Sequence, residues 1–554
     1  MNVYTKVITS LSLPLKRCCH TGIRNAAASQ IVEVPTKSDH SRRGNLPDII
    51  HDQFKIAVDD GEYGLVQVDR RPKFAFHLNG AVRRGLEHGE YRIGLHPGTM
   101  RIVTLSMPIN LQDAYSVLLD GYHKKDLRRE AQKLYHFIKN REPPLEKHVR
   151  DQKVAEMMAK IINSERVDPE HPNVIESDRN ELLNIRDQRL KKQIRQHIYN
   201  HAPIDFSKHY NCMAYMMARL PADYAALVKA MSQLKAQLPD FAPSSMMDFG
   251  SGVGSATWAV DKVWPKQCQE VVNVDNSSEM NLLNEKLQRG GTLEGPYQQR
   301  SKRTFFRNYL PISATIKHNL VVMSRTLLEL NSADARLRIL DILWKTVTPG
   351  GCLLLVEDGR YQSFDLMLEA REFLRVGIEA TGSGRRGIIV APCPHQHSCP
   401  LLLKEKRYRK CTDSIMHLTL DKDTSTVPEE TFSYLAVYKP KARDLVEGFK
   451  IANCNAWPRI VQPVKTSSHS IVRVCNKYGD LQELSVTNAK NGNLCRQVAR
   501  RHKLGDLFPV ELLPVDKHYQ QEGKLYGMLK HHRRAMLPAP SNATTTEDDN
   551  ENQG

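Results

Sequence analysis

The segment Asp248-Phe-Gly-Ser-Gly-Val-Gly254 constrains the fold of this chain more than any other part of the sequence. Ser245-Met-Met-Asp248 leads into it and residues 255–260 leave it with helical character, so its glycines fall where a strand gives way to a helix. Glycine at such a junction permits a sharp turn and lets backbone N–H groups approach a ligand without a Cβ in the way. The glycines concerned are Gly250, Gly252 and Gly254.

A second carboxylate follows at the end of the next apolar run. Residues 271–275 read Val-Val-Asn-Val-Asp and predict a strand that ends in Asp275, about twenty residues after the last glycine. An acid at that position can accept both hydroxyls of a ribose. The glycines alone would also suit a tight turn in any α/β unit, but the ordered pair of Asp248 and Asp275 favours a nucleotide site.

This order of motifs resembles that of the class I S-adenosylmethionine-dependent methyltransferases. Asp248 matches the acid of the family's first motif, and Asp275 matches its ribose-binding carboxylate. The resemblance implies that S-adenosylmethionine binds to these two acids and to the loop glycines, which are Gly250, Gly252 and Gly254. A nicotinamide dehydrogenase fits less well, because an acid begins the loop and no substrate domain with an obvious proton donor follows.

Later segments extend the same sheet. Residues 318–323 and 352–357 are apolar and predict strands, and residues 333–347 predict the helix that crosses between them. The predicted fold class is therefore α/β, with a Rossmann-like class I methyltransferase domain. Residues 324–330 follow the fourth strand of that domain and hold no obvious catalytic group, so we assign no catalytic residue.

Four of the eleven cysteines lie in the segment where the sheet pattern fades. Two of them share the run Ala391-Pro-Cys-Pro-His-Gln-His-Ser-Cys-Pro400, in which each thiol is followed by a proline that stiffens the turn. Four thiolates brought together from a loop and a distant strand can hold a tetrahedral zinc ion or a cubane iron–sulfur cluster. The candidate metal ligands are Cys393, Cys399, Cys411 and Cys475.

The spacing of these cysteines does not choose the metal, since it contains neither paired Cys-x-x-Cys knuckles nor a ferredoxin run. His395 and His397 would also allow a mixed zinc site. A further alternative is four unrelated buried thiols, because free cysteine is a common small hydrophobe. We interpret the other cysteines beyond the N-terminal segment in that way, namely Cys212, Cys268, Cys352, Cys454 and Cys495.

Several segments together carry a closer resemblance. They are Tyr215–Tyr224, Cys393–His395, Cys399–Leu401, Cys411, Trp457–Arg459, Cys475 and Lys503–Leu507. Across residues 200–510 the chain resembles the methyltransferase-like protein 17 family, a mitochondrial family related to a yeast mitoribosomal small-subunit protein. The resemblance implies a [4Fe–4S] cluster on the four cysteines, rRNA binding and a role in assembling the small mitochondrial ribosomal subunit. We expect no methyl transfer; an active rRNA methyltransferase is the alternative, and a zinc-bearing RNA-binding protein is a third possibility.

The charge of the chain points to a polyanionic partner. Its formal net charge is +17, and neutralisation of phosphates by Lys and Arg is the usual basis of RNA affinity. One basic run, Lys406-Arg-Tyr-Arg-Lys410, lies between two candidate metal ligands, where Tyr408 can stack on a base. We therefore expect small-subunit rRNA and ribosomal proteins as partners of a chain that is a monomer when free.

The N-terminal residues predict a mitochondrial address. Residues 1–30 contain basic residues, serines and threonines, and no acid precedes Glu33, as is typical of a cleaved mitochondrial presequence. The sequence has no run of about twenty apolar residues with which to span a membrane. We therefore expect a mitochondrial matrix protein without membrane insertion.

The sequence predicts a succession of distinct segments. They are a targeting peptide at 1–30, a mixed and then helical region at 31–199, the Rossmann-like domain at 200–390, the four-cysteine module at 391–510, and a basic segment with an acidic tail at 511–554. The helical pattern begins near residue 111. The tail is too polar and acidic to fix a conformation, so we expect it to be disordered.

Overall fold

The computed structural model divides into two compact units, Met1–Asp39 with Asn79–Pro509, and His40–Leu78 with Val510–Gly554. The residues it describes are 54–59, 62–67, 74–99, 102, 104–164, 175–197, 203–298, 303–310, 316–378, 387–403, 410–419, 427–442, 444, 457–465 and 469–514. None of the described helices combines the length and the apolar composition that a membrane span requires.

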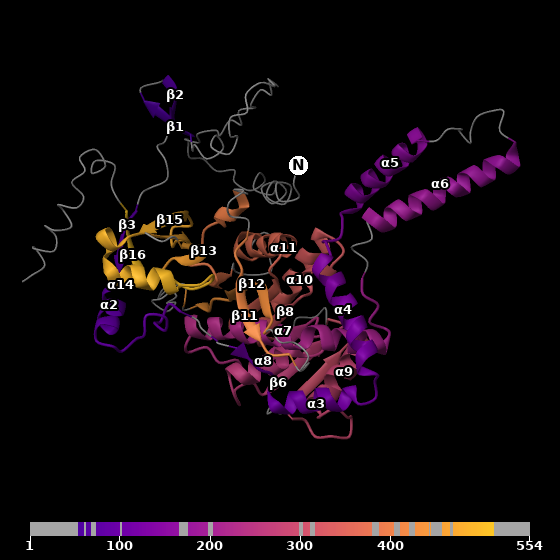
Figure 1. Cartoon of the computed structure of the whole chain (residues 1–554), viewed down its shortest axis with the longest axis horizontal. Coiled ribbons are helices and arrows are strands. Elements are labelled where there is room, and N and C mark those ends of the chain that lie inside the picture. Colours follow the sequence, from indigo (N-terminus) through magenta and orange to yellow (C-terminus); the bar gives the residue numbers. More distant parts are fainter. Residues whose placement is uncertain are drawn as a thin grey trace, which may run out of the picture. The chain divides into compact units, whose positions relative to one another are not determined.

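A nine-stranded sheet forms the centre of the larger unit (Figure 1). Its parallel strands are β5 Ser245–Phe249, β6 Glu270–Val274, β7 Arg303–Arg307, β8 His318–Ser324 and β9 Val347–Asp358. They lie in the order β7-β6-β5-β8-β9, so that the order reverses between β5 and β8. In open α/β sheets, ligands bind at such a switch point, outside the carboxyl ends of the strands.

Antiparallel strands complete one side of this sheet. β12 Glu429–Tyr438 pairs with β9. β10 Ile388–Ala391 and β11 Asp413–His417 both pair with β12. Beyond them, β4 Thr104–Leu105 lies parallel to β11. Strands from both sides of the predicted boundary at residue 390 therefore share one sheet. The division between a Rossmann-like domain and a four-cysteine module stays a prediction.

Helices cover both faces of the sheet. One face packs against α7 His209–Gln237, α8 Ser255–Val263 and α9 Ser278–Gln288. The other face packs against α10 Ala333–Thr346 and α11 Tyr361–Glu372. On this second side there are also a 3₁₀ turn at Leu327–Glu329 and a π-helical turn at Phe373–Gly377. In β8, Leu320 and Val322 enter the first core while Val321 and Met323 enter the second. Alternate residues of a strand point to opposite faces, so both faces are apolar, and the predicted α/β sheet is confirmed.

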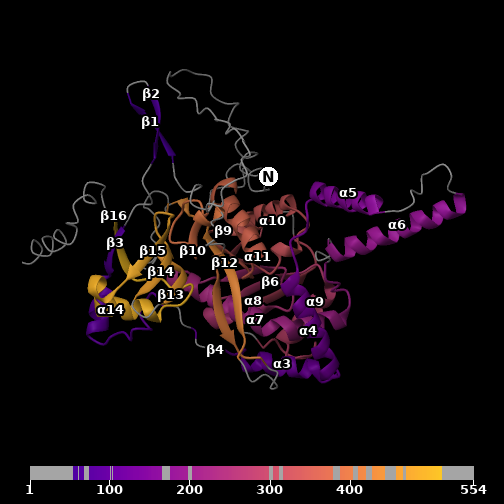
Figure 2. The ribbon, with the colours of Figure 1, turned by 45° about the horizontal axis from the view of Figure 1, so that its top comes forward.

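The region before the sheet is helical from residue 109 onward, as predicted. Its helices are α2 Gly80–Glu87, α3 Ile109–Leu119, α4 Lys124–Asn140, α5 Lys147–Ser164 and α6 Glu176–His197. Leu111 of α3 and Leu127 of α4 are fully buried in the first core. Helices α5 and α6 instead run side by side, and Ile161 is the only described α5 side chain that is buried (Figure 2).

A small antiparallel sheet follows the central one along the chain. Its strands are β13 Arg459–Lys465, β14 Ser470–Cys475 and β15 Leu481–Val486, and the helix α14 Asn488–Arg501 comes after them. The buried residues of α14 are Cys495, Val498 and Ala499. Before this sheet, a 3₁₀ turn at Pro400–Leu403 follows Cys399 directly.

The smaller unit consists of two strand pairs among its described residues. β1 Phe54–Asp59 pairs antiparallel with β2 Glu62–Gln67, and β3 Phe74–Leu78 pairs antiparallel with β16 Val510–Pro514. The second pair joins segments from near the two ends of the chain. The sequence pattern left residues 31–110 without an assigned role and did not predict this pairing.

Candidate functional site

The glycine loop leaves the carboxyl end of β5 on a left-handed backbone. Gly250, Gly252 and Gly254 have φ values of +71°, +48° and +77°, which residues with a side chain rarely adopt. A Cβ on Gly250 would lie 2.2 Å from Oγ1 of Thr326. A Cβ on Gly254 would lie 2.0 Å from Oδ1 of Asn284, whereas one on Gly252 would meet nothing within 4 Å. The first and third glycines are thus needed for packing, and the middle one borders open space.

Asp275 lies beside the glycine loop, as predicted from its place after β6. Its Oδ2 accepts the Gly252 N–H at 2.9 Å, and its Oδ1 accepts the Ser277 N–H at 2.9 Å. Burial raises the pKa of this carboxyl, and the two hydrogen bonds oppose that rise. The carboxylate therefore fixes the loop at the edge where a ribose would lie.

Asp248 is buried at the end of β5 and lines a pocket next to the loop. Burial raises its pKa to about 8, and the nearby charge of Asp275 adds to the effect. Two carboxyls in one water-poor site resist being ionised together. A ligand that offers hydroxyl or amino donors would relieve this strain on the pair.

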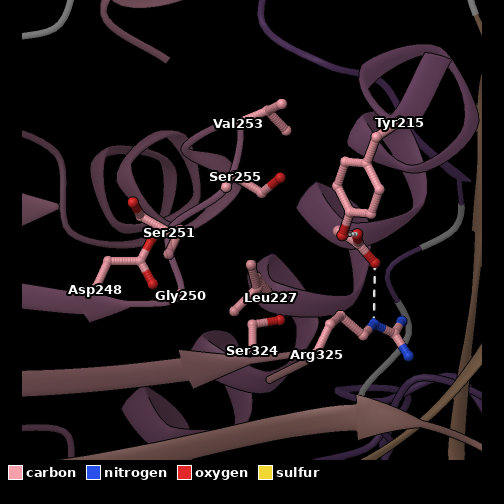
Figure 3. Close-up of a pocket in the computed structure, with 12 residues that line it drawn as sticks. Tyr215, Leu227, Asp248, Gly250, Ser251, Val253, Ser255, Ser324 and Arg325 are labelled. Carbon is pink, nitrogen blue, oxygen red and sulfur yellow. Dashed lines mark hydrogen bonds and ion pairs between the residues drawn. The ribbon is translucent and has the colours of Figure 1, made fainter. Parts of the chain in front are cut away.

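The pocket is partly open to solvent, and its cavity volume is about 30 Å³. Figure 3 shows Asp248 and Ser251 on one side of it, and Tyr215 and Arg325 on the other. The far wall combines α7 with the residue that follows β8. Arg325 there has a φ of +58° and donates from Nε to Oδ1 of Asp223 at 3.0 Å.

The far wall continues into a buried ion-pair network. Glu430 of β12 accepts from Nη2 of Arg219 at 3.0 Å and from Nη2 of Arg325 at 2.9 Å, and Lys139 lies 3.4 Å away. Burial alone would raise the pKa of Glu430, but the surrounding cations lower it well below its ordinary value. Asp223 bridges Arg219 and Arg325 from α7. The network therefore joins α4, α7, β8 and β12 behind the pocket.

The pocket has unused polar groups that suit a polar ligand. Oγ of Ser251 and Oγ of Ser324 are buried and make no hydrogen bond to any described residue. Both residues line the pocket, and the glycine loop brings backbone N–H groups to its edge. Buried hydroxyls normally have partners, so these two point to a ligand that supplies them. An adenosyl amino acid, with ribose hydroxyls, an amino group and a carboxylate, fits this donor and acceptor set.

The four predicted metal ligands lie away from the glycine loop along the chain. Cys399 and Cys475 belong to one buried apolar cluster, and Cys411 packs against its edge. Cys393 follows β10 and packs against the core beneath α10 and α11. Cys393 and Cys399 thus lie in the loop after β10, Cys411 lies two residues before β11, and Cys475 ends β14.

The electrostatics place the four thiols within range of one another. Burial raises the pKa of Cys475, and the neighbouring thiols of Cys393, Cys399 and Cys411 raise it further. Burial raises the pKa of Cys411 to about 11, and Arg459 opposes that rise. Among the residues that the structure describes, no three His, Cys, Asp or Glu side chains take up positions that would hold a metal ion. The thiols share a neighbourhood without forming a coordination shell.

His395 faces this neighbourhood as a neutral donor. Its Nδ1 accepts the backbone N–H of His397 at 3.2 Å, so the ring proton is on Nε2, which lies 3.3 Å from Sγ of Cys475. Burial, with a further contribution from the charge of Arg371, lowers the pKa of His395 to about 3. The arrangement suits a hydrogen bond to sulfur.

The remaining described cysteines behave as small hydrophobes, as predicted. Cys212, Cys268, Cys352 and Cys495 are all buried. Burial raises the pKa of Cys212, Cys268 and Cys495 to about 12. Residues outside the described part of the chain include Cys454, residues 404–409 of the basic stretch with Tyr408, the N-terminal 30 residues and the acidic tail, whereas Lys410 is described and donates to the carbonyl of Gly359 at 2.6 Å.

Sequence reasoning missed the buried charges around both sites. Arg325 lies in the segment after β8 that held no recognised motif, and its partners Asp223 and Glu430 are far away in sequence. Arg371 is also buried and was not singled out, and the buried Arg459 was named only as the end of the resemblance segment Trp457–Arg459. The only available signal was a charged residue in an otherwise apolar helix or strand. Such a residue indicates a buried ion pair but does not indicate which residue is the partner.

A Rossmann-like sheet with a glycine loop and a paired acid at its switch point defines this protein as a methyltransferase-type nucleotide-binding fold. The sequence narrows this class to one family. The model of the family described as mitochondrial small ribosomal subunit Rsm22 matches residues 209–509, and the chain belongs to that family. The family and the curated relatives are mitochondrial, so the predicted mitochondrial location is confirmed.

Two curated relatives illustrate the similarity. The chain is 29% identical over 419 residues to the human "Ribosome assembly protein METTL17, mitochondrial". This match covers 75% of this chain and 85% of that protein. It is 27% identical over 328 residues to "Rsm22-cox11 tandem protein 2, mitochondrial" of Schizosaccharomyces pombe. That match covers 54% of this chain and 43% of the relative. The resemblance to the methyltransferase-like protein 17 family is thereby confirmed.

Solved structures similar to this chain include two methyltransferases. The N-methyltransferase NodS of Bradyrhizobium japonicum, in complex with S-adenosyl-L-homocysteine, has a TM-score of 0.24 and 13% identity over 38% of this chain and 86% of that chain. Human N-acetylserotonin methyltransferase, in complex with SAM, has a TM-score of 0.25 and 11% identity over 52% of this chain and 67% of that chain.

Proposed function

We propose that this protein is an assembly factor of the small mitochondrial ribosomal subunit that acts in the matrix, as a monomer when free. It binds small-subunit rRNA, holds S-adenosylmethionine at the glycine loop and carries a [4Fe–4S] cluster on four cysteines. It does not transfer a methyl group. The observation that carries the proposal is the match of residues 209–509 to the Rsm22 family, together with a relative whose name describes ribosome assembly.

The rRNA partner is supported by charge. The chain carries a formal net charge of +17, and a basic protein neutralises phosphates without needing a particular base sequence. The predicted basic loop between Cys399 and Cys411 would add an aromatic surface for stacking.

The cofactor is supported by the pocket. Asp275 and Gly252 would meet the ribose, and Asp248 with the unpartnered Ser251 and Ser324 would meet the remaining polar groups. When bound, S-adenosylmethionine would supply an activated methyl group. Bound at a site with no assigned base, it would instead stabilise the domain through the free energy of binding.

The cluster is supported by the chemistry of the donor set. The thiols of Cys393, Cys399 and Cys411 raise the pKa of Cys475, and Cys399 and Cys475 are buried in one apolar cluster. Thiolates are the ligands of iron–sulfur clusters and of structural zinc alike. Such a centre would link the loops after β10 to the start of β11 and the end of β14, and so fix the module that presents the basic loop.

The absence of methyl transfer is supported by the wall opposite the loop. In place of a general base, that wall carries Arg325, whose guanidinium is already held by Asp223 and Glu430. A guanidinium remains charged in proteins and cannot accept a proton from a methyl acceptor.

The proposal can be tested by crosslinking in intact mitochondria. The full chain should crosslink to small-subunit rRNA and sediment with small-subunit precursors, and its loss should deplete mature small subunits while large subunits persist. Crosslinks spread evenly over large-subunit rRNA and messenger RNA would contradict an assembly role.

The pocket is also consistent with a second function, that of an active rRNA methyltransferase. Methyl transfer from a sulfonium donor can rely largely on proximity and alignment, so a missing base alone does not exclude it. A tritiated-methyl assay on immature small-subunit rRNA separates the two functions, with Asp275→Ala as the control. Incorporation that depends on Asp275 would establish the enzyme; no incorporation above the control agrees with the proposal.

A further inference from the structure

Helices α5 and α6 form an arm that the rest of the described chain covers little. Among the described residues of the pair, only Ile161 and Arg186 are buried. The two helices run side by side, and the start of α5 lies with the end of α6 at the end of the arm nearer the sheet (Figure 1, Figure 2). A helix that is polar on nearly every side needs support from something other than its own apolar face.

The segment that leads into the arm is fixed to the central sheet. Arg360, which follows β9, donates from Nη1 to the carbonyl of Lys139 at 2.9 Å. Glu146, the residue before α5, accepts the N–H of Ala333 at the start of α10 at 2.7 Å. Lys139 also reaches Glu430 of the buried ion-pair network. The arm therefore begins at the carboxyl edge of the sheet, the edge at which the glycine loop lies.

The charges of the arm are divided between its two ends. Residues 147–153 and 186–197, which we call the root, contain eight Lys and Arg and two acids, Asp151 and Asp187. Residues 154–164 and 176–185, which we call the tip, contain two Lys and Arg and four acids. Cations gathered in one place repel one another, so the root is stabilised by an anionic partner and the tip is not.

The cations of the root are balanced differently from those of α4. In α4, Lys124, Arg129 and Lys133 are exposed, and each forms an ion pair with an acid three or four residues away. In the root, six exposed cations form no ion pair with any residue that the structure describes. Their charges are therefore available to an external anion. These six cations are Lys147, Arg150, Lys153, Arg189, Lys191 and Lys192.

The residue types of the arm favour the phosphates of base-paired RNA. Single-stranded RNA is bound largely through bases that stack on aromatic rings, and residues 147–197 contain no Phe, Tyr or Trp. His148 is the one described aromatic ring of the root. Base-paired RNA is instead bound mostly through its shape, its phosphates and its 2′-hydroxyls. The spacing of three residues between the cations of α5 places them side by side on the helix surface, as contact with a row of phosphates requires.

We propose that the root of the arm is the surface that binds base-paired small-subunit rRNA through its phosphates. This role rests on the proposed rRNA binding and assigns it to particular residues. The unpaired cations of the root neutralise phosphates and release the counterions that the RNA holds, so the affinity depends on salt and not on base sequence. Because the root is fixed to the carboxyl edge of the sheet, the bound RNA lies at the same edge as the glycine loop.

The test is filter binding of the full chain to a transcript of the mitochondrial small-subunit rRNA and to a short RNA duplex, over a range of salt concentrations. A variant that combines Lys147→Gln, Arg150→Gln and Lys153→Gln should bind both RNAs about tenfold more weakly. Its slope of log affinity against log salt concentration should fall in magnitude by about 2–3, close to one for each lost phosphate contact. A second variant tests the other helix with Arg189→Gln, Lys191→Gln and Lys192→Gln.

The matched control combines Lys124→Gln, Arg129→Gln and Lys133→Gln in α4. It removes the same number of exposed cations, but each of these is already paired with an acid. It should bind both RNAs within about twofold of the wild type. All three variants should keep the wild-type melting temperature, because every substituted side chain is exposed.

Each outcome decides the matter. Weaker binding with a smaller salt slope in a root variant, absent in the α4 variant, supports the role of the root. Wild-type affinity and slope in both root variants overturn it and leave the proposed rRNA binding intact, as does an equal loss in the α4 variant. A wild-type chain that binds a single strand more tightly than a duplex of the same length contradicts base-paired recognition. Root variants that bind RNA normally but no longer sediment with small-subunit precursors would assign the root to a ribosomal protein instead. A wild-type chain that does not bind the transcript overturns the proposed function itself.

Discussion

The glycine-loop pocket and the thiol site reach their chemistry by opposite routes. The loop side of the pocket is built from residues close in sequence, 248–275, which the strand–loop–helix order brings together, and α7 with the end of β8 adds the far wall. The thiol site joins Cys393 to Cys475 across two loops and two strands, and its charges come from α11 and β13. A local motif can be recognised in the sequence, whereas a site whose residues are far apart in sequence is formed only by the whole fold.

One helix contributes to both regions. α7 supplies Tyr215 and Asp223 to the pocket wall, and its later residues Lys229 and Gln233 bind Asp413, two residues after Cys411. The two sites are therefore separate in chemistry but share a rigid, buried element. The comparison predicts that damage to the ligands of one site leaves the other largely intact.

The largest expected effect is that of removing a thiol. Cys399→Ala should abolish metal loading and weaken small-subunit rRNA binding by about tenfold or more, because the basic loop loses its anchor. Cofactor affinity should change little. Metal analysis, rRNA filter binding and cofactor calorimetry on one preparation measure all three.

Cys495→Ala is the matched control, since Cys495 is a buried thiol of α14 outside the cluster. It should keep both metal and rRNA binding. Equal loss of rRNA and cofactor binding in Cys399→Ala would mean general unfolding and would remove the distinction between the two regions.

Breaking the network behind the pocket should mainly affect stability. Glu430→Gln leaves Arg219 and Arg325 buried without their shared carboxylate, so the free energy of unfolding should fall by about 3–5 kcal/mol. Glu429→Gln alters the exposed neighbour in β12 and should change it by less than about 0.5 kcal/mol. Chemical denaturation of the two variants makes the comparison, and equal midpoints would show that the network contributes nothing.

A substitution in the loop should affect the pocket alone. In Gly250→Ala the new Cβ meets Thr326 on a left-handed backbone, and strain of about 1–2 kcal/mol should weaken cofactor binding by about tenfold. Gly492→Ala has a similar φ of +80° and meets nothing within 4 Å, so it controls for backbone strain outside the pocket. Calorimetry that finds the same affinity in both variants would argue against the loop as the cofactor site.

The smallest effect is a pH dependence of the pocket. Because the folded-state pKa of Asp248 is raised to about 8, the stability that its proton confers is full below about pH 4 and is lost as the pH rises through about 8. Asp248→Asn lacks this titration, so the wild type should lose unfolding free energy relative to the variant between about pH 6 and about pH 8.5. Exposed Asp240→Asn serves as the control, and parallel pH curves for the wild type and Asp248→Asn would contradict the assignment.

Sequence patterns were enough to predict four strands of the parallel sheet, β5, β6, β8 and β9, and the glycine loop after β5, but they did not predict β7. Strands buried on both faces appear as continuous apolar runs, and the glycine loop must sit where one of them ends. Asp248 and Asp275 were found because each closes such a run. The cysteines were also found, but only their residue type and the family resemblance connected them.

The rest could not be predicted, for a physical reason. Glu430 meets Arg219 only because β12 inserts antiparallel beside β9, and Arg459 meets Asp413 only because β13 returns to β11. Charge pairs between residues far apart in sequence leave no periodic pattern. The pairing of β3 with β16, between distant segments, was missed for the same reason.

The most direct measurement is the metal content of the full chain purified without oxygen. Visible absorption together with iron, sulfide and zinc analysis should give about four irons and four sulfides per chain and a broad brown absorption. Loss of that absorption in Cys475→Ala would tie it to the predicted ligands. A single tightly held zinc ion, or no metal at all, would contradict the account.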